Sequence, residues 1–288
     1  MNFGKILTAM VTPFNEHGEL DLVRTTKLVE HLMNNGSDGL VVCGTTGESP
    51  TLTFEEKIKL IKHVVEVVDK KIPVLAGTGS NNTSETVQLT KEVESLGVDG
   101  IMLVAPYYNK PSQQGLYEHF KTVAQSTTLP IMLYNIPGRS VVNMSVETTV
   151  ELSKIPNIVS IKDATGNLDM MSEIIEKTDE NFSLYSGDDG LTLPALSVGA
   201  TGVVSVASHI IGNEMQNMIN AFEQGHVKES ASLHRKLLPK MNACFMAPSP
   251  APVKAALNHL GVQVGSVRLP LVPLTDEEKN SLITQLNI

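Results

Sequence analysis

This sequence of 288 residues has no tryptophan, only two cysteines, and aromatic side chains at just 4% of its positions. Cys43 lies inside an apolar run and Cys244 stands beside Phe245, so neither a disulfide framework nor a zinc site has the thiols it needs. No apolar run reaches the roughly 18 residues of a membrane-spanning helix, and no signal cleavage site follows the N-terminus. These absences predict inert core thiols in a cytoplasmic protein that does not bind membranes.

Basic side chains are in the minority. The 22 lysines and arginines against 31 aspartates and glutamates give a formal net charge of −9 at pH 7, which argues against broad binding to nucleic acid. The eight histidines are scattered without a His-Glu-x-x-His motif, so no metal site is expected. Gly77–Asn82 begins like a dinucleotide fingerprint but does not end in glycine, so no cofactor is expected either. Small molecules are the predicted partners.

The sequence does contain a repeated alternation of short apolar runs with longer amphipathic segments, which is typical of parallel strands joined by crossover helices. Eight such units fill residues 4 to 225, the size of a (β/α)₈ barrel, whereas a doubly wound open sheet would carry a nucleotide fingerprint after its first strand. The predicted fold class is therefore α/β, a TIM barrel. Its predicted strands are Ile6–Val11, Gly39–Gly44, Val74–Gly79, Ile101–Pro106, Ile131–Ile136, Ile158–Ala164, Phe182–Gly187 and Val203–Ser208.

Helix signals lie between and after these strands. Thr53 and Glu56 form a capping box, and glycines at the predicted helix ends suit a left-handed residue, namely Gly36, Gly97, Gly199 and Gly225. Helices are predicted to start near Leu20, Thr53, Thr83, Gln113, Ser145, Leu168, Leu191 and Gly212. After Gly225 the strand pattern stops, and three further helices are predicted over His226–Phe245, Pro252–Leu260 and Thr275–Leu286. The predicted organisation is a barrel with the active site over 1–225 and a helical C-terminal region over 226–288.

The sixth predicted strand carries a lysine where the chemistry of such a barrel is found, at the carboxyl end. Alternation places Ser160, Lys162 and Ala164 on one face, suited to a crowded barrel interior, and Val159 and Ile161 on the other. The alternative is a lysine that extends to water, the commoner fate of this residue, although the apolar residues before it argue against that.

A buried lysine suggests a particular chemistry. Burial disfavours the ammonium form and increases the fraction of free amine, which can attack a ketone. The resulting Schiff base is an electron sink, so the adjacent carbon can lose a proton and become a nucleophile. Aldol chemistry of this class needs neither a metal nor a cofactor. We therefore expect Lys162 to be the catalytic nucleophile.

Two other strand ends carry side chains suited to such a reaction. After the second strand, the glycines of Gly44–Ser49 allow a tight turn whose amides can bind a carboxylate, such as that of an α-keto acid. After the fifth, Tyr134 can transfer a proton and Arg139 can bind a carboxylate through two hydrogen bonds. Without further evidence, a structural role as a core tyrosine is slightly favoured over catalysis for Tyr134. A surface ion pair is likewise slightly favoured over ligand binding for Arg139.

The fourth and seventh strand ends carry weaker signals. Tyr107 and Tyr108 follow the fourth strand and would serve the active site, an interface between subunits, or both. After the seventh, Gly187 could bring its backbone close to a ligand, whereas Asp188 and Asp189 are predicted to cap the next helix.

Three motifs occur in order: Gly-Thr-Thr-Gly-Glu (44–48), Tyr-Asn-Ile-Pro-Gly-Arg (134–139) and Ile-Lys-Asp-Ala (161–164). With them the chain resembles the dihydrodipicolinate synthase and N-acetylneuraminate lyase family over essentially its full length. Members acting on sugar acids typically carry Gly-Ser-Thr-Gly-Glu, whereas this chain has Thr45 at the serine position and also has Arg139. The resemblance is therefore greatest to the branch that condenses pyruvate with L-aspartate 4-semialdehyde in lysine and diaminopimelate biosynthesis.

The resemblance implies a role for each catalytic side chain. Lys162 would form the Schiff base with pyruvate, while Thr45, Tyr134 and Tyr108 would relay protons. In relatives the tyrosine at the position of Tyr108 reaches in from a neighbouring subunit. The expected assembly is therefore a homodimer or a homotetramer built as a dimer of dimers.

The resemblance also implies where the substrates bind. Thr46 and the backbone near Thr45 would hold the pyruvate carboxylate, with Gly187 and Val204 lining the site. Arg139 would receive the carboxylate of L-aspartate 4-semialdehyde.

Relatives that are inhibited by lysine bind it at the dimer interface. The positions that match this pattern are Ser49, Asn81, Glu85 and Tyr107. Where lysine-sensitive members commonly have histidines, however, this chain has Phe54 and Lys57, and a cation at 57 would repel the ammonium groups of lysine. Weak or absent feedback inhibition is therefore expected.

Two alternatives remain open on the sequence alone. The first is an aldolase of the same fold that cleaves N-acetylneuraminate or a 2-keto-3-deoxy sugar acid. The second is a ligand-binding barrel that has lost catalysis.

Overall fold

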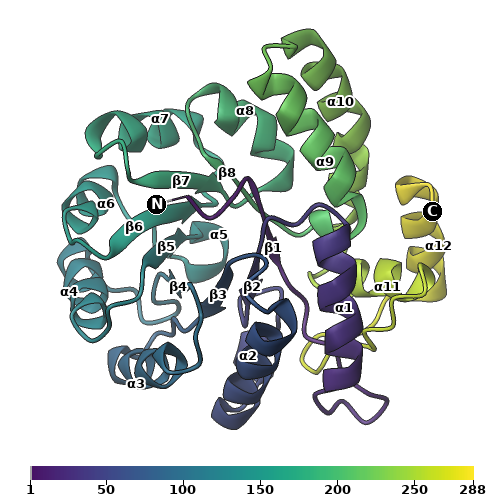
Figure 1. Cartoon of the computed structure of the whole chain (residues 1–288), viewed down its shortest axis with the longest axis horizontal. Coiled ribbons are helices and arrows are strands. Elements are labelled where there is room, and N and C mark those ends of the chain that lie inside the picture. Colours follow the sequence, from purple (N-terminus) through teal and green to yellow (C-terminus); the bar gives the residue numbers. More distant parts are fainter. Residues whose placement is uncertain (1) are drawn as a thin grey trace.

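The computed structural model describes residues 2–288 and shows a closed barrel of eight parallel strands surrounded by helices (Figure 1). Each strand pairs with the next along the chain, and β8 closes the ring by pairing with β1. The predicted α/β class and TIM barrel are thereby confirmed. The strands are β1 (Ile6–Ala9), β2 (Gly39–Val42), β3 (Val74–Gly77), β4 (Gly100–Val104), β5 (Ile131–Asn135), β6 (Ile158–Asp163), β7 (Ser183–Ser186) and β8 (Gly202–Ser205).

All eight predicted strands are present, and each ends one to three residues earlier than the apolar pattern suggests. At β2 the chain leaves the sheet at Cys43, which has a left-handed φ of 58° although it belongs to the same apolar run. At β8 the predicted end, Ser208, is already the first residue of the next helix. The residues between the observed and the predicted strand ends are therefore buried or half-buried residues at the carboxyl end of the barrel.

The predicted helices are also present, and seven of the eight crossover helices start within two residues of the predicted position. The exception is α9, which starts at Ser208 rather than near Gly212 and departs from helical geometry at Ile211. The helices are α1 (Leu22–Asn34), α2 (Phe54–Val68), α3 (Thr83–Glu94), α4 (Gln113–Ala124), α5 (Pro137–Ser140), α6 (Val146–Ser153), α7 (Leu168–Lys177), α8 (Thr192–Ser197), α9 (Ser208–Glu223), α10 (Val227–Ala243), α11 (Ala251–His259) and α12 (Asp276–Leu286), with short 3₁₀ turns η1 (Ser49–Thr51) and η2 (Asp189–Leu191).

The local helix signals are confirmed. Thr53 caps α2 by accepting a hydrogen bond from the Glu56 amide, while the Glu56 carboxylate accepts one from the Thr53 amide. The four glycines expected after helices have positive φ, namely Gly36, Gly97, Gly199 and Gly225. The short helix α5, by contrast, was not predicted, because Pro-Gly suggests a turn.

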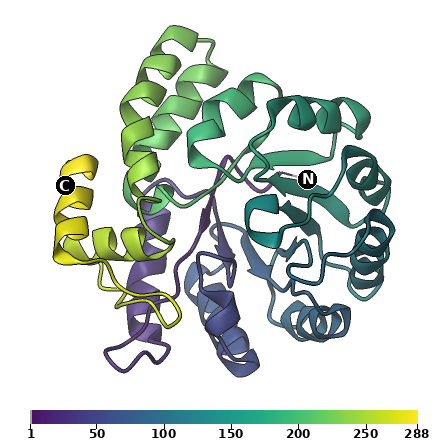
Figure 2. The ribbon, with the colours of Figure 1, turned by 180° about the vertical axis from the view of Figure 1, so that it is seen from behind.

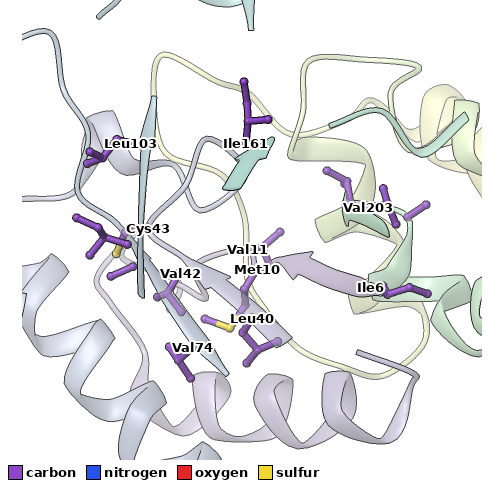
Figure 3. Close-up of a cluster of buried hydrophobic side chains, with 14 of the residues drawn as sticks. Ile6, Met10, Val11, Leu40, Val42, Cys43, Val74, Leu103, Ile161 and Val203 are labelled. Carbon is purple, nitrogen blue, oxygen red and sulfur yellow. The ribbon is translucent and has the colours of Figure 1, made fainter. Parts of the chain in front are cut away.

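The strands separate two apolar cores. Ile6, Val42 and Ile161 belong to the larger core between strands and helices, part of which Figure 3 shows. Leu7, next to Ile6, and Val41, next to Val42, face the barrel interior instead. At the amino end of the barrel the Phe3 side chain joins the interior cluster, and its amide donates to the Tyr185 hydroxyl at 3.0 Å.

The alternation predicted for the sixth strand holds from Ser160 onward but is wrong at Val159. The pairing of β5 with β6 shifts register there, so that Ile131 faces Ile158 and Met132 faces Ser160. Val159 is left as an extra residue and packs against the interior cluster, whereas Ile161 faces the helices as expected. A bulge of this kind leaves no mark in an apolar pattern.

The C-terminal helices α10, α11 and α12 lie together on one side of the barrel, as Figure 2 shows from behind. α10 packs along α9, and α12 packs on both α10 and α11. The chain after α11 returns to the barrel, where the Phe14 amide donates to the Val264 carbonyl at 3.1 Å. The domain boundary after residue 225 stays a prediction. Within residues 2–288 there is no helix with the length and apolar character to cross a membrane.

Candidate active site

Lys162 lies inside the ring of strands with 5% of its surface exposed. Its Nζ is 4.1 Å from the centre of the Tyr134 ring, which is beside it in register on β5. Tyr185 is beside it on β7 and belongs to the apolar interior cluster. The structure therefore places this amine among aromatic and apolar groups and not in bulk water, in contrast to the alternative of a lysine extended to solvent.

Gly187 has no side chain, and this leaves room for the side chain of Lys162. A Cβ atom at position 187 would lie 3.0 Å from Lys162 Cε and 2.7 Å from Ala164 Cβ. The Gly187 amide also donates to the Asp163 carbonyl at 2.6 Å, which fixes the end of β7 against β6. Val204, with 1% of its surface exposed, contributes to the same interior cluster from β8.

A cavity of about 250 Å³ lies at the carboxyl end of the barrel. Thr45, Tyr134 and Arg139, three of the predicted catalytic and substrate-binding residues, line it together. Lys162 is not among the lining residues, but it contacts one of them through the Tyr134 ring. The remaining lining residues are Cys43, Gly44, Ser49, Pro50, Lys57, Gly77, Gly79, Ser80, Met102, Val104, Tyr107, Ile136 and Ser140.

The loop after β2 forms the tight turn that its glycines suggest. The Thr12 hydroxyl donates to the Gly47 carbonyl at 2.6 Å, and the Glu48 amide donates to the Thr45 carbonyl at 3.0 Å. Thr46 is buried in this turn. Burial raises the pKa of the preceding Cys43 to about 12, so its thiol stays protonated at neutral pH, as expected of an inert core cysteine.

Arg139 lies exposed on the unpredicted helix α5 and lines the cavity from there. The segment after α5 is fixed by Asn135, whose amide nitrogen donates to Asn143 Oδ1 at 2.9 Å and to the Met144 carbonyl at 3.1 Å. Within residues 2–288 no carboxylate forms an ion pair with Arg139, so the alternative of a surface ion pair is not what this chain shows. The guanidinium can therefore receive the carboxylate of a ligand.

The two tyrosines after β4 have different positions. Tyr107 lines the cavity and is half-buried, and both this burial and the nearby Glu85 carboxylate raise its pKa. The Asn81 backbone acts in the opposite direction and lowers this pKa, so Asn81 and Glu85, two of the other predicted regulatory residues, both lie near Tyr107, and Ser49 lines the same cavity. Tyr108 instead is 87% exposed and does not line the cavity of its own chain.

The prediction that both aspartates after β7 cap the next helix is half wrong. Asp188 does cap the η2 turn, accepting from the Gly190 amide at 2.8 Å. Asp189 is buried, and its carboxylate accepts from the Ser205 hydroxyl and the amides of Val206 and Ala207. Burial raises the pKa of Asp189, whereas these hydrogen bonds oppose the rise. Asp189 thus fixes the end of β8, a contact across sequence that no local pattern reveals.

Comparison with known proteins agrees with this geometry. The sequence profile of the Dihydrodipicolinate synthetase family matches residues 2–288. A protein of Oceanobacillus iheyensis named 4-hydroxy-tetrahydrodipicolinate synthase is 63% identical over 287 residues, covering 100% of this chain and 97% of that protein. A crystal structure of dihydrodipicolinate synthase from Bacillus anthracis superposes with a TM-score of 0.98 at 61% identity, covering 100% of this chain and 98% of that one. The lysine-bound enzyme of Cyanidioschyzon merolae gives 0.97 at 47% identity, with coverages of 99% and 97%. This chain therefore belongs to the dihydrodipicolinate synthetase family.

Proposed function

We propose that this enzyme condenses pyruvate with L-aspartate 4-semialdehyde to form 4-hydroxy-tetrahydrodipicolinate, in lysine and diaminopimelate biosynthesis. The observation that carries the proposal is the amine of Lys162, which lies in the barrel interior against the Tyr134 ring. The names of the relatives at 56–63% identity support the same reaction.

In this mechanism the Lys162 amine attacks the ketone carbon of pyruvate, and water leaves as the Schiff base forms. The pyruvate methyl carbon then loses a proton, and the resulting enamine attacks the aldehyde carbon of the second substrate. Water hydrolyses the Schiff base and frees Lys162, and the amino group of the released product then condenses with its own ketone, losing water, to close the ring. Thr45 and Tyr134 line the cavity beside this amine and can carry the protons.

We assign the two substrate carboxylates to different parts of the cavity. The turn that contains Thr46, together with the backbone near Thr45, holds the pyruvate carboxylate. Gly187, which lies against Lys162, and Val204 of the interior cluster line the site on the side of this amine. Arg139 receives the carboxylate of L-aspartate 4-semialdehyde. The reaction as written needs no metal or cofactor, and residues 2–288 hold no group of three potential metal ligands.

We further propose that Tyr108 completes the relay in a neighbouring copy of the chain. Its exposure of 87% and its absence from the cavity of its own chain support this arrangement. Its φ of 73° lies in the left-handed region, which is unusual for a tyrosine. A homodimer is the smallest assembly that meets this need, and a homotetramer made of two such dimers meets it equally. The cytoplasmic location likewise stays a prediction.

A substrate-preference assay tests the proposed function. At saturating pyruvate, kcat/KM for L-aspartate 4-semialdehyde should exceed kcat/KM for the cleavage of N-acetylneuraminate or a 2-keto-3-deoxy sugar acid, measured without added pyruvate, by about 10²-fold or more, because Thr45 and Arg139 suit the smaller substrate. Condensation is followed with a reductase that consumes its product, and cleavage is followed through the pyruvate that it releases. Preference for a sugar acid would favour the aldolase alternative, and no turnover of any of these compounds would favour the ligand-binding barrel.

Lysine is expected to inhibit this enzyme weakly or not at all. Lys57 lines the same cavity as Ser49 and Tyr107, where its charge would repel the ammonium groups of a lysine ligand. Initial rates measured against increasing lysine should give an inhibition constant in the millimolar range or above. The double variant Phe54→His/Lys57→His restores the side chains common in lysine-sensitive relatives and should be inhibited more strongly. A micromolar constant for the unchanged chain would contradict this expectation.

A further inference from the structure

A buried ion pair joins the loop after β2 to the C-terminal helices. Glu48 directly follows the turn that carries Thr45 and Thr46, and Lys254 lies on α11. Their side chains are 1% and 2% exposed, and Glu48 Oε1 is 2.6 Å from Lys254 Nζ. The second carboxylate oxygen, Oε2, accepts a hydrogen bond from the Arg268 amide at 2.8 Å. Both partners of the Glu48 carboxylate thus come from the C-terminal region.

The cation is held just as firmly. Lys254 Nζ donates to the Ser266 carbonyl at 2.8 Å and lies 4.2 Å from the centre of the Phe14 ring. Burial lowers the pKa of Lys254 to about 8, while the Glu48 charge favours the ammonium form. The Arg268 guanidinium lies 4.2 Å from the same ring and also pairs with Glu56. The segment from Glu48 to Glu56 is therefore tied to the C-terminal region at both ends.

The backbone at Glu48 needs such a tie. Its φ of 55° and ψ of 35° are left-handed, a conformation that residues other than glycine rarely adopt unless surrounding contacts hold them. Buried ion pairs contribute little to stability compared with apolar replacements, and their best-supported use is to select one conformation. Neither Glu48 nor Lys254 lines the cavity, so a direct chemical role is not indicated for either.

We propose that the Glu48–Lys254 ion pair positions the Thr45–Thr46 turn for pyruvate, which makes the C-terminal helices part of the active-site scaffold. The inference rests on the proposed function, because it concerns the carboxylate that this turn would bind. The sequence motif contains Glu48 but not its partner, since Lys254 lies on α11, near the other end of the chain.

The test is kinetic and uses the full chain. Lys254→Met should raise the KM for pyruvate about tenfold and lower kcat about 10²-fold, because a displacement of about 1 Å in a positioning group has effects of that size. The KM for L-aspartate 4-semialdehyde should change less than about twofold, since Arg139 is carried by α5, which the pair does not touch. Rates are expressed per site that borohydride traps with pyruvate, so that misfolded protein does not count.

Two further variants make the result decisive. Glu48→Gln/Lys254→Met leaves no unpaired charge, so it should recover the Tm of the unchanged protein and still show the altered KM for pyruvate and the altered kcat. Lys279→Met removes an exposed lysine of α12 and should behave as the unchanged chain. If the double variant recovers both Tm and kinetics, or if Lys254→Met keeps both KM values and the rate per trapped site of the unchanged chain, the positioning role is wrong. Loss of turnover in the unchanged chain would instead contradict the proposed function.

Discussion

Lys162→Ala is expected to lose turnover and the pyruvate adduct together. The unchanged chain, treated with pyruvate and borohydride, should gain the mass of one reduced pyruvyl group on the peptide that contains Lys162. The variant should gain none, and its kcat should fall by about 10⁵-fold or more, as when other catalytic nucleophiles are removed. The physical reason is that, among the lysines of residues 2–288, only this one combines burial in the barrel interior with contact to a residue that lines the cavity.

Two comparisons separate this result from unfolding and from non-specific labelling. Lys162→Met keeps most of the side-chain volume in the crowded interior, so it should retain Tm while also failing to form the adduct. Lys177→Ala removes an exposed lysine on α7 and should be labelled and active like the unchanged chain. An adduct on another lysine, or one that persists in both Lys162 variants, would overturn the assignment of the nucleophile.

The barrel was predictable because its pattern is local. Parallel strands buried on both faces appear as apolar runs, and crossover helices appear as capped amphipathic segments, so the order of elements follows from short windows of sequence. The strand ends were less predictable, since Cys43 and Ala207 continue the apolar runs yet already lie outside the strands. Val159 shows the same limit, because a register shift between neighbouring strands depends on pairing that no single strand contains.

The residues of the candidate site likewise include some that were predictable from local sequence and some that were not. Lys162, Thr45 and Tyr134 stand at strand ends, where barrel topology alone brings them together. The residues that hold these groups in place depend instead on contacts across the fold. In the sequence Asp189 resembles a helix cap, but its carboxylate binds the backbone at the end of β8. Glu48 resembles the last residue of a loop motif, but its carboxylate pairs with Lys254 on α11. Their partners could be found only once the chain was folded.

Tyr108→Phe is expected to lower kcat by about 10²- to 10⁴-fold, the range for the loss of a group that transfers protons. The substitution removes one oxygen and leaves the left-handed backbone and the ring unchanged, so Tm should stay the same. Adduct formation with pyruvate and borohydride should persist, because Lys162 is unaffected. Tyr117→Phe removes the hydroxyl of a tyrosine on α4 away from the cavity and should leave kcat as it is. An unchanged kcat in Tyr108→Phe would exclude this residue from the relay.

Mixing the two impaired variants then shows from which subunit Tyr108 acts. When Lys162→Ala and Tyr108→Phe chains are unfolded, mixed in equal amounts and refolded, half of the dimers formed at random contain one chain of each kind. If Tyr108 serves the neighbouring copy, each mixed dimer has one complete site, with Lys162 from one chain and Tyr108 from the other, and one site that lacks both. The mixture should then recover about a quarter of the activity of the unchanged protein, although each variant alone is nearly inactive. If Tyr108 served its own chain, no mixed dimer would contain a complete site and the mixture would stay inactive, so the exposure of this tyrosine would need another explanation.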